Sequence, residues 1–385
     1  MKQVTTQLYI HIPFCKRKCE YCDFLSQTAG LPLQEQYVQA LIQEIENHPY
    51  RQQISNVTTI FMGGGTPSIL KPEWIQDIVR AVANNFSILP EAEISIECNP
   101  GTTTPEALEQ YRKIGINRIS FGLQSAKNRE LKELGRIHTY EEFLTSYKQA
   151  RAAGFSNINV DLMSALPGQT LSSYCETLEC VLELQPEHIS AYSLIIEEHT
   201  PFYEKYREDD RIRSRGGTPK RLPDEDTERL MYEQTEEKLN KQGYRRYEIS
   251  NYAKQGYECR HNIGYWRREN YLGFGLGAAS LFCNRRWKNT EDMKSYLTGE
   301  TITKIEELSK ESQMEEFFFL GLRMTQGIKK EDFFKEFSES IEDRYGKVVE
   351  QLQENNLLQV SEEGICFTEY GRDISNYVLA QFLIE

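Results

Sequence analysis

Short apolar runs alternate along the first half of the chain with segments in which apolar residues recur every three or four positions. The short runs predict strands at residues 8–12, 58–62, 93–97, 118–122, 158–163 and 188–194. Helical periodicity follows five of them, at residues 34–47, 71–85, 104–114, 140–153 and 171–184. This alternation predicts a parallel α/β sheet. Right-handed crossovers would curl six such units into a partial (β/α)6 barrel, with functional residues at the carboxyl ends of the strands.

The second half of the chain has a different pattern. Residues 204–226 are highly charged and contain two glycines and two prolines, which predicts an exposed loop or linker. A helix at 225–242 and an aromatic, extended segment to about residue 287 follow. Helices at 309–322, 329–337 and 341–355, then a hairpin of 357–360 and 365–368, predict a C-terminal, mainly helical module like a winged helix. We therefore expect three parts, at residues 1–225, 226–300 and 301–385.

Composition narrows the classes of protein. The chain has 45 Lys and Arg against 58 Asp and Glu, a net charge of −13, which argues against a nucleic-acid-binding surface. It shows no apolar run of eighteen residues and no apolar signal core at its start, so neither a membrane span nor a secretory signal is predicted. Nine cysteines without a secreted-type framework indicate a reducing compartment, and we expect a cytoplasmic protein. Five of them are interpreted as structural: Cys98, Cys175, Cys180, Cys283 and Cys366.

Three cysteines directly after the first predicted strand carry the strongest chemical signal. Cys15, Cys19 and Cys22 have the spacing C-x3-C-x2-C on a loop with basic residues at positions 16–18. Three thiolates on one short loop can bind three irons of a four-iron, four-sulfur (4Fe-4S) cluster and leave the fourth iron open to a small molecule. The alternatives are a zinc site and unpaired buried thiols. Zinc usually takes a second pair of Cys or His at matching spacing, which the sequence does not show.

Polar residues stand at the ends of other predicted strands. Three glycines before Thr66 would let backbone N–H groups approach a ligand without interference from a Cβ atom, and the alternative is a tight turn. Glu97 could pair with an ammonium group or with ribose hydroxyls. Gln124 ends the fourth strand, and Arg136 beyond it could bind a carboxylate through paired hydrogen bonds. Asp161 lies in an apolar strand, where an unpaired charge would be costly. Taken singly, Glu97 and Arg136 would more often be surface ion-pair residues.

These motifs resemble those of the radical SAM superfamily, whose members bind S-adenosyl-L-methionine (SAM) beside a 4Fe-4S cluster. The matching segments are YIHIPFCKRKCEYCDF (9–24), FMGGGTPSIL (61–70), ISIECNPG (94–101), RISFGLQSAKNRELKELGR (118–136), NVDLMSALPGQT (159–170) and CRHNIGYW (259–266). Within the superfamily the chain is most similar to the HemN/HemW family of oxygen-independent coproporphyrinogen III oxidases and heme chaperones. The resemblance implies that SAM binds the open iron and that electron transfer cleaves it to a 5′-deoxyadenosyl radical.

The resemblance also implies roles for individual residues. The SAM-binding positions of the family are matched here by Gly64, Gly65, Thr66, Glu97, Gln124, Arg136 and Asp161, and more loosely by Ser193 and Ala279. Ala279 stands where many relatives carry His. Tyr9 and His11 would lie beside SAM and the cluster, and Tyr21 near the adenine. Without that context, a histidine on a strand is more often a structural residue.

Two features favour the heme chaperones of this family over the oxidases. The oxidase pattern has a further cysteine two residues after the third ligand, where this chain has Phe24. In the HemW-type proteins an HNxxYW motif is linked to heme, which implies heme binding by His261, Tyr265 and Trp266. Imidazole can ligate iron, and the aromatic rings suit a porphyrin. The alternatives are a buried aromatic cluster capped by His261 and a thiolate ligand from Cys259.

The expected protein is a heme chaperone that holds a 4Fe-4S cluster, SAM and heme. It would deliver heme to acceptor hemoproteins, without nucleic acid as a partner and with a homodimer left open. The alternative functions are an oxygen-independent coproporphyrinogen III oxidase, which converts propionate side chains to vinyl groups, and a radical SAM enzyme that acts on another substrate.

Overall fold

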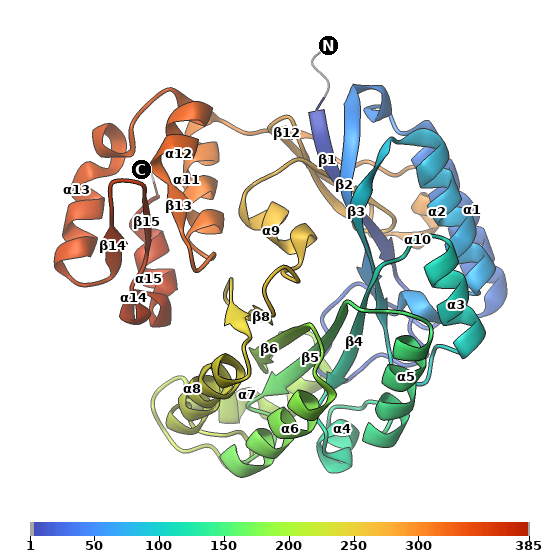
Figure 1. Cartoon of the computed structure of the whole chain (residues 1–385), viewed down its shortest axis with the longest axis horizontal. Helices are drawn as coiled ribbons and strands as arrows, with labels where there is room; N and C mark the ends of the chain where they lie inside the picture. The colour runs from blue at the N-terminus through green and yellow to red at the C-terminus, as the bar shows by residue number, and fades with distance from the viewer. Residues whose placement is uncertain (1–3, 384–385) are drawn as a thin grey trace.

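A twelve-stranded sheet forms the body of the protein, seen here in a computed structural model that describes residues 4–383. Six neighbouring parallel strands follow the chain order: β1 (Val4–Ile12), β2 (Ile54–Gly64), β3 (Ile88–Cys98), β4 (Arg118–Gln124), β5 (Ile158–Ser164) and β6 (His188–Ser193). The following helices are α1 (Leu31–Asn47), α2 (Pro72–Asn85), α3 (Pro105–Lys113), α5 (Tyr140–Ala152), α6 (Leu171–Leu184) and α7 (Pro201–Arg213). Figure 1 shows a curved sheet with α1, α2, α3 and α5 on its convex side, which confirms the predicted partial barrel.

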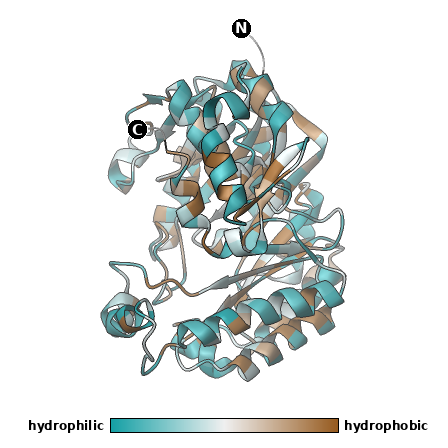
Figure 2. Ribbon diagram, turned by 90° about the vertical axis from the view of Figure 1, so that its left-hand side faces the viewer, coloured by the Kyte–Doolittle hydropathy of each residue, from teal (hydrophilic) through white to brown (hydrophobic). Residues whose placement is uncertain are grey.

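Alternation along the strands separates an apolar face from a polar face. Ile10, Met62, Ile96, Ile119 and Ile158 are neighbours in one row across the sheet, and none of them is exposed. They form one hydrophobic core with the apolar stripes of the covering helices. Figure 2, viewed from the side of the C-terminal module, shows hydrophilic and hydrophobic residues mixed along the helices. Because this core lies on the convex side, the polar residues of the same strands face the concave side and remain available for ligands.

Residues 245–307 extend the sheet at both edges. β8 (Asn251–Ala253) pairs with β6, and β7 (Arg245–Arg246) pairs with β8. At the other edge β9 (Tyr271–Phe274) lies parallel to β1, followed by β10 (Ala279–Phe282), β11 (Arg285–Lys288) and β12 (Glu306–Glu307). The chain between the two edges crosses the concave side and includes the short helix α9 (Arg260–Trp266) (Figure 1). Helices α8 (Glu225–Lys241) and α10 (Met293–Leu297) complete this region.

The C-terminal residues form a module with a core of its own. Its elements are α11 (Lys310–Gly321), β13 (Ile328–Lys329), α12 (Lys330–Phe337), α13 (Ile341–Glu354), β14 (Leu358–Val360), β15 (Gly364–Phe367), α14 (Glu369–Asp373) and α15 (Ser375–Ala380). Phe318, Phe333, Tyr345 and Phe382 pack against one another at its centre. The three predicted helices and the β14–β15 hairpin are confirmed, whereas β13, α14 and α15 were not predicted.

The predicted loop at residues 204–226 was wrong in its first part, because α7 continues to Arg213. The hydroxyl of Thr200 accepts the N–H of Tyr203, and Pro201 occupies the first helical position, so the helix has a strong start. Phe202 and Tyr206, four residues apart, are completely buried on one face. The apolar stripe is too narrow to stand out among the charged residues. The short helix α4 (Asn128–Glu133) was missed for a similar reason.

Two further expectations are corrected. Residues 260–266 are helical and not extended, because a distant carboxylate, that of Glu93, accepts the backbone N–H groups of Arg260 and His261 and so caps α9. Cys283, interpreted as structural, is exposed in the turn between β10 and β11. Cys98 is buried, as that interpretation requires. Among residues 4–383, none of the helices has both the length and the apolar character needed to cross a membrane.

Candidate cofactor-binding site

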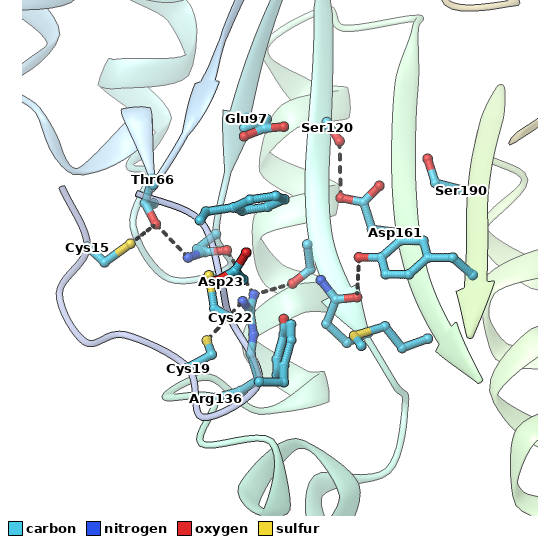
Figure 3. Close-up of a pocket in the computed structure, with 18 of the residues that line it drawn as sticks. Cys15, Cys19, Cys22, Asp23, Thr66, Glu97, Ser120, Arg136, Asp161 and Ser190 are labelled. Atoms are coloured by element: carbon cyan, nitrogen blue, oxygen red, sulfur yellow. Dashed lines mark hydrogen bonds between the residues drawn. The ribbon is translucent and has the colours of Figure 1, made fainter. Parts of the chain in front are cut away.

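A cavity of about 490 Å³ lies at the carboxyl ends of β2–β6 beside the cysteine loop (Figure 3). Pockets for small molecules commonly measure ~300–1,000 Å³, so a nucleotide-sized ligand is within range. The structure brings these predicted residues to its wall: Cys15, Cys19, Tyr21, Cys22, Gly64, Gly65, Thr66, Glu97, Gln124, Arg136, Asp161 and Ser193. They come from five strands, the cysteine loop and the segment that follows α4, so residues more than 170 positions apart in sequence share one site.

The loop that carries the three cysteines is fixed at several points. It leaves β1 at Pro13, whose carbonyl accepts the N–H of Gln27 at 2.8 Å, while the carbonyl of Gln27 accepts the N–H of Cys15 at 3.0 Å. In the middle of the loop Glu20 donates its N–H to Leu134 at 3.2 Å. A turn bond from Cys22 N–H to the Cys19 carbonyl shapes the last part. These bonds hold the loop across the mouth of the barrel.

Two of the three sulfur atoms receive hydrogen bonds from neighbouring elements. The hydroxyl of Thr66 donates to Cys15 Sγ at 3.6 Å, and the guanidinium of Arg136 donates to Cys19 Sγ at 3.6 Å (Figure 3). Asn99 lies between the two donors and bonds to both of them. Both bonds direct a hydrogen-bond donor at a sulfur atom that could bind iron.

The glycines before Thr66 are required by close contacts. A Cβ at Gly65 would lie 2.6 Å from the carbonyl oxygen of Phe14, and one at Gly64 would lie 2.4 Å from the ring of His11. Gly64 also has a φ of +109°, which other residues rarely adopt. Its N–H donates to the Glu97 carboxylate at 3.1 Å. The turn therefore brings backbone close to both the cysteine loop and a carboxylate.

Glu97 and Asp161 place two carboxylates in the wall of the cavity. Removal from bulk water and the negative charge of Asp161 raise the pKa of Glu97 to about 7. Burial also raises the pKa of Asp161, opposed by hydrogen bonds from Asn159 at 2.7 Å and Ser120 at 3.3 Å. A positively charged ligand would relieve the repulsion between the two carboxylates. The ammonium and sulfonium groups of SAM have that charge, so the site fits this cofactor electrostatically.

The far wall of the cavity is shaped by the ends of β4–β6. Gln124 has a φ of +74° at an irregularity in the pairing of β4 with β5. Its side-chain oxygen accepts the hydroxyl of Tyr192 at 3.2 Å. Ser193 lies at the end of β6, 3.1 Å from the hydroxyl of Ser164. Strained backbone of this kind is concentrated at ligand sites, where the surrounding structure holds it in place.

The arrangement of the cysteines is compatible with a cluster. Among residues 4–383, no three Cys, His, Asp or Glu side chains converge tightly enough to bind one metal ion. In a 4Fe-4S cluster each thiolate binds a different iron, so the sulfur atoms need not converge on one point. A tetrahedral zinc site would require that convergence. Cys15, Cys19 and Cys22 are all free and partly exposed, so they are available as ligands.

Three predicted residues do not line the cavity. Tyr9 and His11 lie behind the glycine turn, where the Tyr9 hydroxyl is 3.0 Å from His11 Nδ1 and His11 Nε2 is 2.9 Å from the Leu25 carbonyl. Both nitrogens of His11 therefore have partners, which suits a residue that supports the cysteine loop. Ala279 is exposed on β10, opposite Lys288.

His261 lies in a separate, buried aromatic cluster on the concave side of the sheet. Its Nδ1 is 2.6 Å from the Thr59 hydroxyl, its Nε2 is 3.1 Å from the Tyr265 hydroxyl, and its ring stacks on Phe61 at 5.2 Å. Burial, helped by the charge of Arg118, lowers its pKa to about 3, so the imidazole is neutral. In this arrangement both ring nitrogens are engaged, as expected for a histidine that caps a buried aromatic cluster.

Trp266, at the end of α9, borders a second cavity of about 800 Å³. This cavity lies between the end of α9 and the C-terminal module, and Met324, Lys329 and Cys366 also line it. The three residues assigned to heme are therefore divided: two point into the aromatic cluster, and one faces a cavity large enough for a porphyrin.

Sequence reasoning missed Asn99, Ser120 and Tyr192, all in the wall of the first cavity. Ser120 alternates with apolar residues on β4, a pattern that could have placed it on the concave face. Asn99 directly follows a predicted strand, the position at which functional residues of such barrels stand. Nothing in the sequence distinguishes Tyr192 from a tyrosine of the core.

Comparison with known proteins gives a consistent assignment. The Radical SAM superfamily model matches residues 9–181, and the HemN C-terminal domain model matches residues 308–374. The chain is 38% identical to the heme chaperone HemW of Lactococcus lactis, over 100% of this chain and 99% of that protein. It is 37% identical to the HemW of Bacillus subtilis, over 98% and 99%, and 34% identical to that of Escherichia coli, over 98% of each.

A solved structure, the coproporphyrinogen III oxidase HemN from Escherichia coli, superposes with a TM-score of 0.83 over 99% of this chain and 90% of that one. At 24% identity this likeness shows the fold alone. The fold and the three-cysteine cavity are those of a radical SAM protein. The chain belongs, within that superfamily, to the HemW family.

Proposed function

We propose that this protein is a heme chaperone of the HemW type, which carries a 4Fe-4S cluster and SAM and transfers heme to acceptor hemoproteins. The observation that carries the proposal is the similarity to HemW proteins along the entire chain, which includes both the cysteine loop and the C-terminal module. The presence of Phe24 where the oxidases have a further cysteine agrees with it.

Different residues of the first cavity would bind the cluster and the separate parts of SAM. Cys15, Cys19 and Cys22 would each bind one iron. Glu97 and Asp161 would bind the ammonium and ribose groups of SAM, since both carboxyl groups line the cavity and the positive charge would offset their mutual repulsion. A reduced cluster beside SAM supplies one-electron chemistry when both are bound. The remaining wall residues orient the nucleotide and limit the access of water.

For heme, we propose the HNxxYW residues His261, Tyr265 and Trp266. Trp266 borders the open second cavity, where a porphyrin ring could stack on the indole. Ligation of iron by His261 would first require its hydrogen bonds to Thr59 and Tyr265 to open, because neither nitrogen is free in the resting structure. Heme would therefore bind in two stages, a fast contact at Trp266 followed by a slower capture by imidazole.

The three-part division at residues 1–225, 226–300 and 301–385 stays a proposal, in which the middle part joins the sheet and contributes α9. The third part has its own core and borders the second cavity, so heme bound there would contact it directly. The identity of the acceptor hemoproteins and a homodimeric assembly stay predictions that binding and light-scattering measurements can test.

The decisive experiment combines two assays on protein reconstituted without oxygen. Heme titration should give saturable binding that His261→Ala weakens, whereas His199→Ala, at an exposed histidine, should leave it unchanged. Thr59→Val should speed the slow stage, because it removes one bond that holds His261. In parallel, coproporphyrinogen III supplied with SAM and reductant should remain unchanged. Formation of protoporphyrinogen would overturn the proposal in favour of the oxidase.

A further inference from the structure

We propose that Asn99 is a positioning residue for the cluster site. It holds Thr66 and Arg136 as hydrogen-bond donors to two of the three cysteine sulfurs and thereby sets the reduction potential of the cluster. The inference rests on the proposed function in one respect, the presence of the cluster.

The geometry is a chain of hydrogen bonds that spans the cavity wall. The Asn99 amide nitrogen donates to Thr66 Oγ1 at 2.8 Å, and that hydroxyl donates to Cys15 Sγ at 3.6 Å. On the other side Arg136 Nη2 donates to Asn99 Oδ1 at 2.8 Å, while Arg136 Nη1 donates to Cys19 Sγ at 3.6 Å. The Asn99 side chain therefore donates to Thr66 and accepts from Arg136.

The Asn99 amide makes both of these bonds with one side chain, because it carries a donor and an acceptor side by side. Thr66 accepts the Asn99 amide N–H and donates its own hydroxyl hydrogen to Cys15 Sγ. Arg136 must find an acceptor that leaves its second nitrogen directed at Cys19. A carboxylate would offer no donor to Thr66, and an amine would offer no acceptor to Arg136. Such chains also polarise one another, so each bond strengthens the next.

Asn99 is itself held firmly, as a positioning role requires. Its backbone N–H donates to the Ser68 hydroxyl at 3.3 Å, and its carbonyl accepts the Thr102 hydroxyl at 2.6 Å and the Thr102 N–H at 3.1 Å. Pro100 and Gly101, the latter with a φ of +73°, form the turn that follows. Three bonds from the backbone of Asn99, directly after β3, thus hold the residue in place.

The expected effect concerns the charge of the reduced cluster. Reduction adds an electron to a cluster whose thiolates already carry negative charge. Donors directed at those sulfurs stabilise the reduced form and raise the potential. Without Asn99, the Thr66 hydroxyl loses the amide that donates to it, and Arg136 Nη2 keeps only the Gly122 carbonyl as its acceptor, so both donors to the sulfurs are held less firmly. We expect Asn99→Ala to shift the reduction equilibrium about tenfold toward the oxidised form, which is about 59 mV for one electron.

The test is a redox titration of reconstituted protein, followed by visible absorbance and electron paramagnetic resonance, with iron and sulfide contents measured on the same samples. Asn117→Ala is the matched control, because Asn117 is also partly buried but bonds only to backbone groups at residues 92 and 94, at the opposite end of the sheet. The control should leave the potential unchanged. An Asn99→Ala protein with a full cluster and an unchanged potential overturns the proposal.

Thr66→Val supplies a second test, because it keeps the side-chain shape and removes only the hydroxyl that donates to Cys15 Sγ. Because Asn99 is argued to act through Thr66 and Arg136, the shift of the Asn99→Ala, Thr66→Val double variant should be smaller than the sum of the two single shifts. Additive shifts contradict the inference. If the unmodified protein itself takes up no iron and sulfide, the cluster in the proposed function fails, which is a separate result.

Discussion

Glu97→Gln should make the metal-free protein more stable at alkaline pH, although it removes a residue of the candidate site. The pKa of Glu97 is raised from 4.5 to about 7, so the folded state binds a proton more tightly than the unfolded state between these values. The carboxylate therefore destabilises the fold progressively from pH 4.5 upward and fully above pH 7. At ~1.36 kcal/mol for each pH unit, the cost at pH 8 is about 3 kcal/mol.

Glutamine removes this cost and keeps an oxygen that can accept the N–H of Gly64. We expect the free energy of unfolding, measured by urea titration with circular dichroism, to rise by about 2–3 kcal/mol at pH 8 and by less than about 1 kcal/mol at pH 5. Glu300→Gln, at an exposed position, serves as the control and should change neither value. Equal or lower stability of Glu97→Gln at pH 8 would refute the electrostatic reasoning.

Three other measurements test the site and its support. Cys19→Ser should abolish the broad iron–sulfur absorbance of anaerobically reconstituted protein; a variant with full iron and sulfide would show that the ligand assignment is wrong. SAM affinity, measured by calorimetry on reconstituted protein, should fall as the pH drops below about 7, since Glu97 then gains a proton and loses its charge; a flat profile would exclude Glu97 as the partner of the ammonium group. Gly264→Ala should destabilise the fold by about 1–3 kcal/mol, because a Cβ there would lie 1.7 Å from the buried Gln7 side chain, whereas Gly346→Ala, where nothing lies within 4 Å, should be neutral or stabilising.

Much of the barrel could be predicted from local patterns. β5 and α6 were found within one residue at each end, because an apolar strand and an amphipathic helix express their periods directly in the sequence. The elements that were missed, such as α4 and most of α7, are short or highly charged. α9 was missed for a different reason, since the Glu93 carboxylate that caps it comes from a strand more than 160 residues away.

The cofactor site was more predictable than the heme segment. A cysteine triplet and a glycine turn are local signals, and the ends of parallel strands must meet at one edge of the sheet. His261 has no such constraint. Its exposure and its partners depend on how α9 packs against β1 and β2, so the HNxxYW pattern could not show that both imidazole nitrogens are engaged. Asn99 was overlooked because its side-chain partners, Thr66 and Arg136, lie more than 30 residues away in sequence on either side, so no local pattern indicates the two bonds.

The sequence by itself determined the order of the strands and helices, the cysteine loop and the strand ends at which ligand-binding groups stand. These features depend on residue periodicity and on short-range spacing. Only the tertiary structure decided which polar side chains meet, which of them are buried and how their charges act on one another. The reason is physical: hydrogen bonds, desolvation and Coulomb interactions depend on distances between groups far apart in the chain, and folding alone sets those distances.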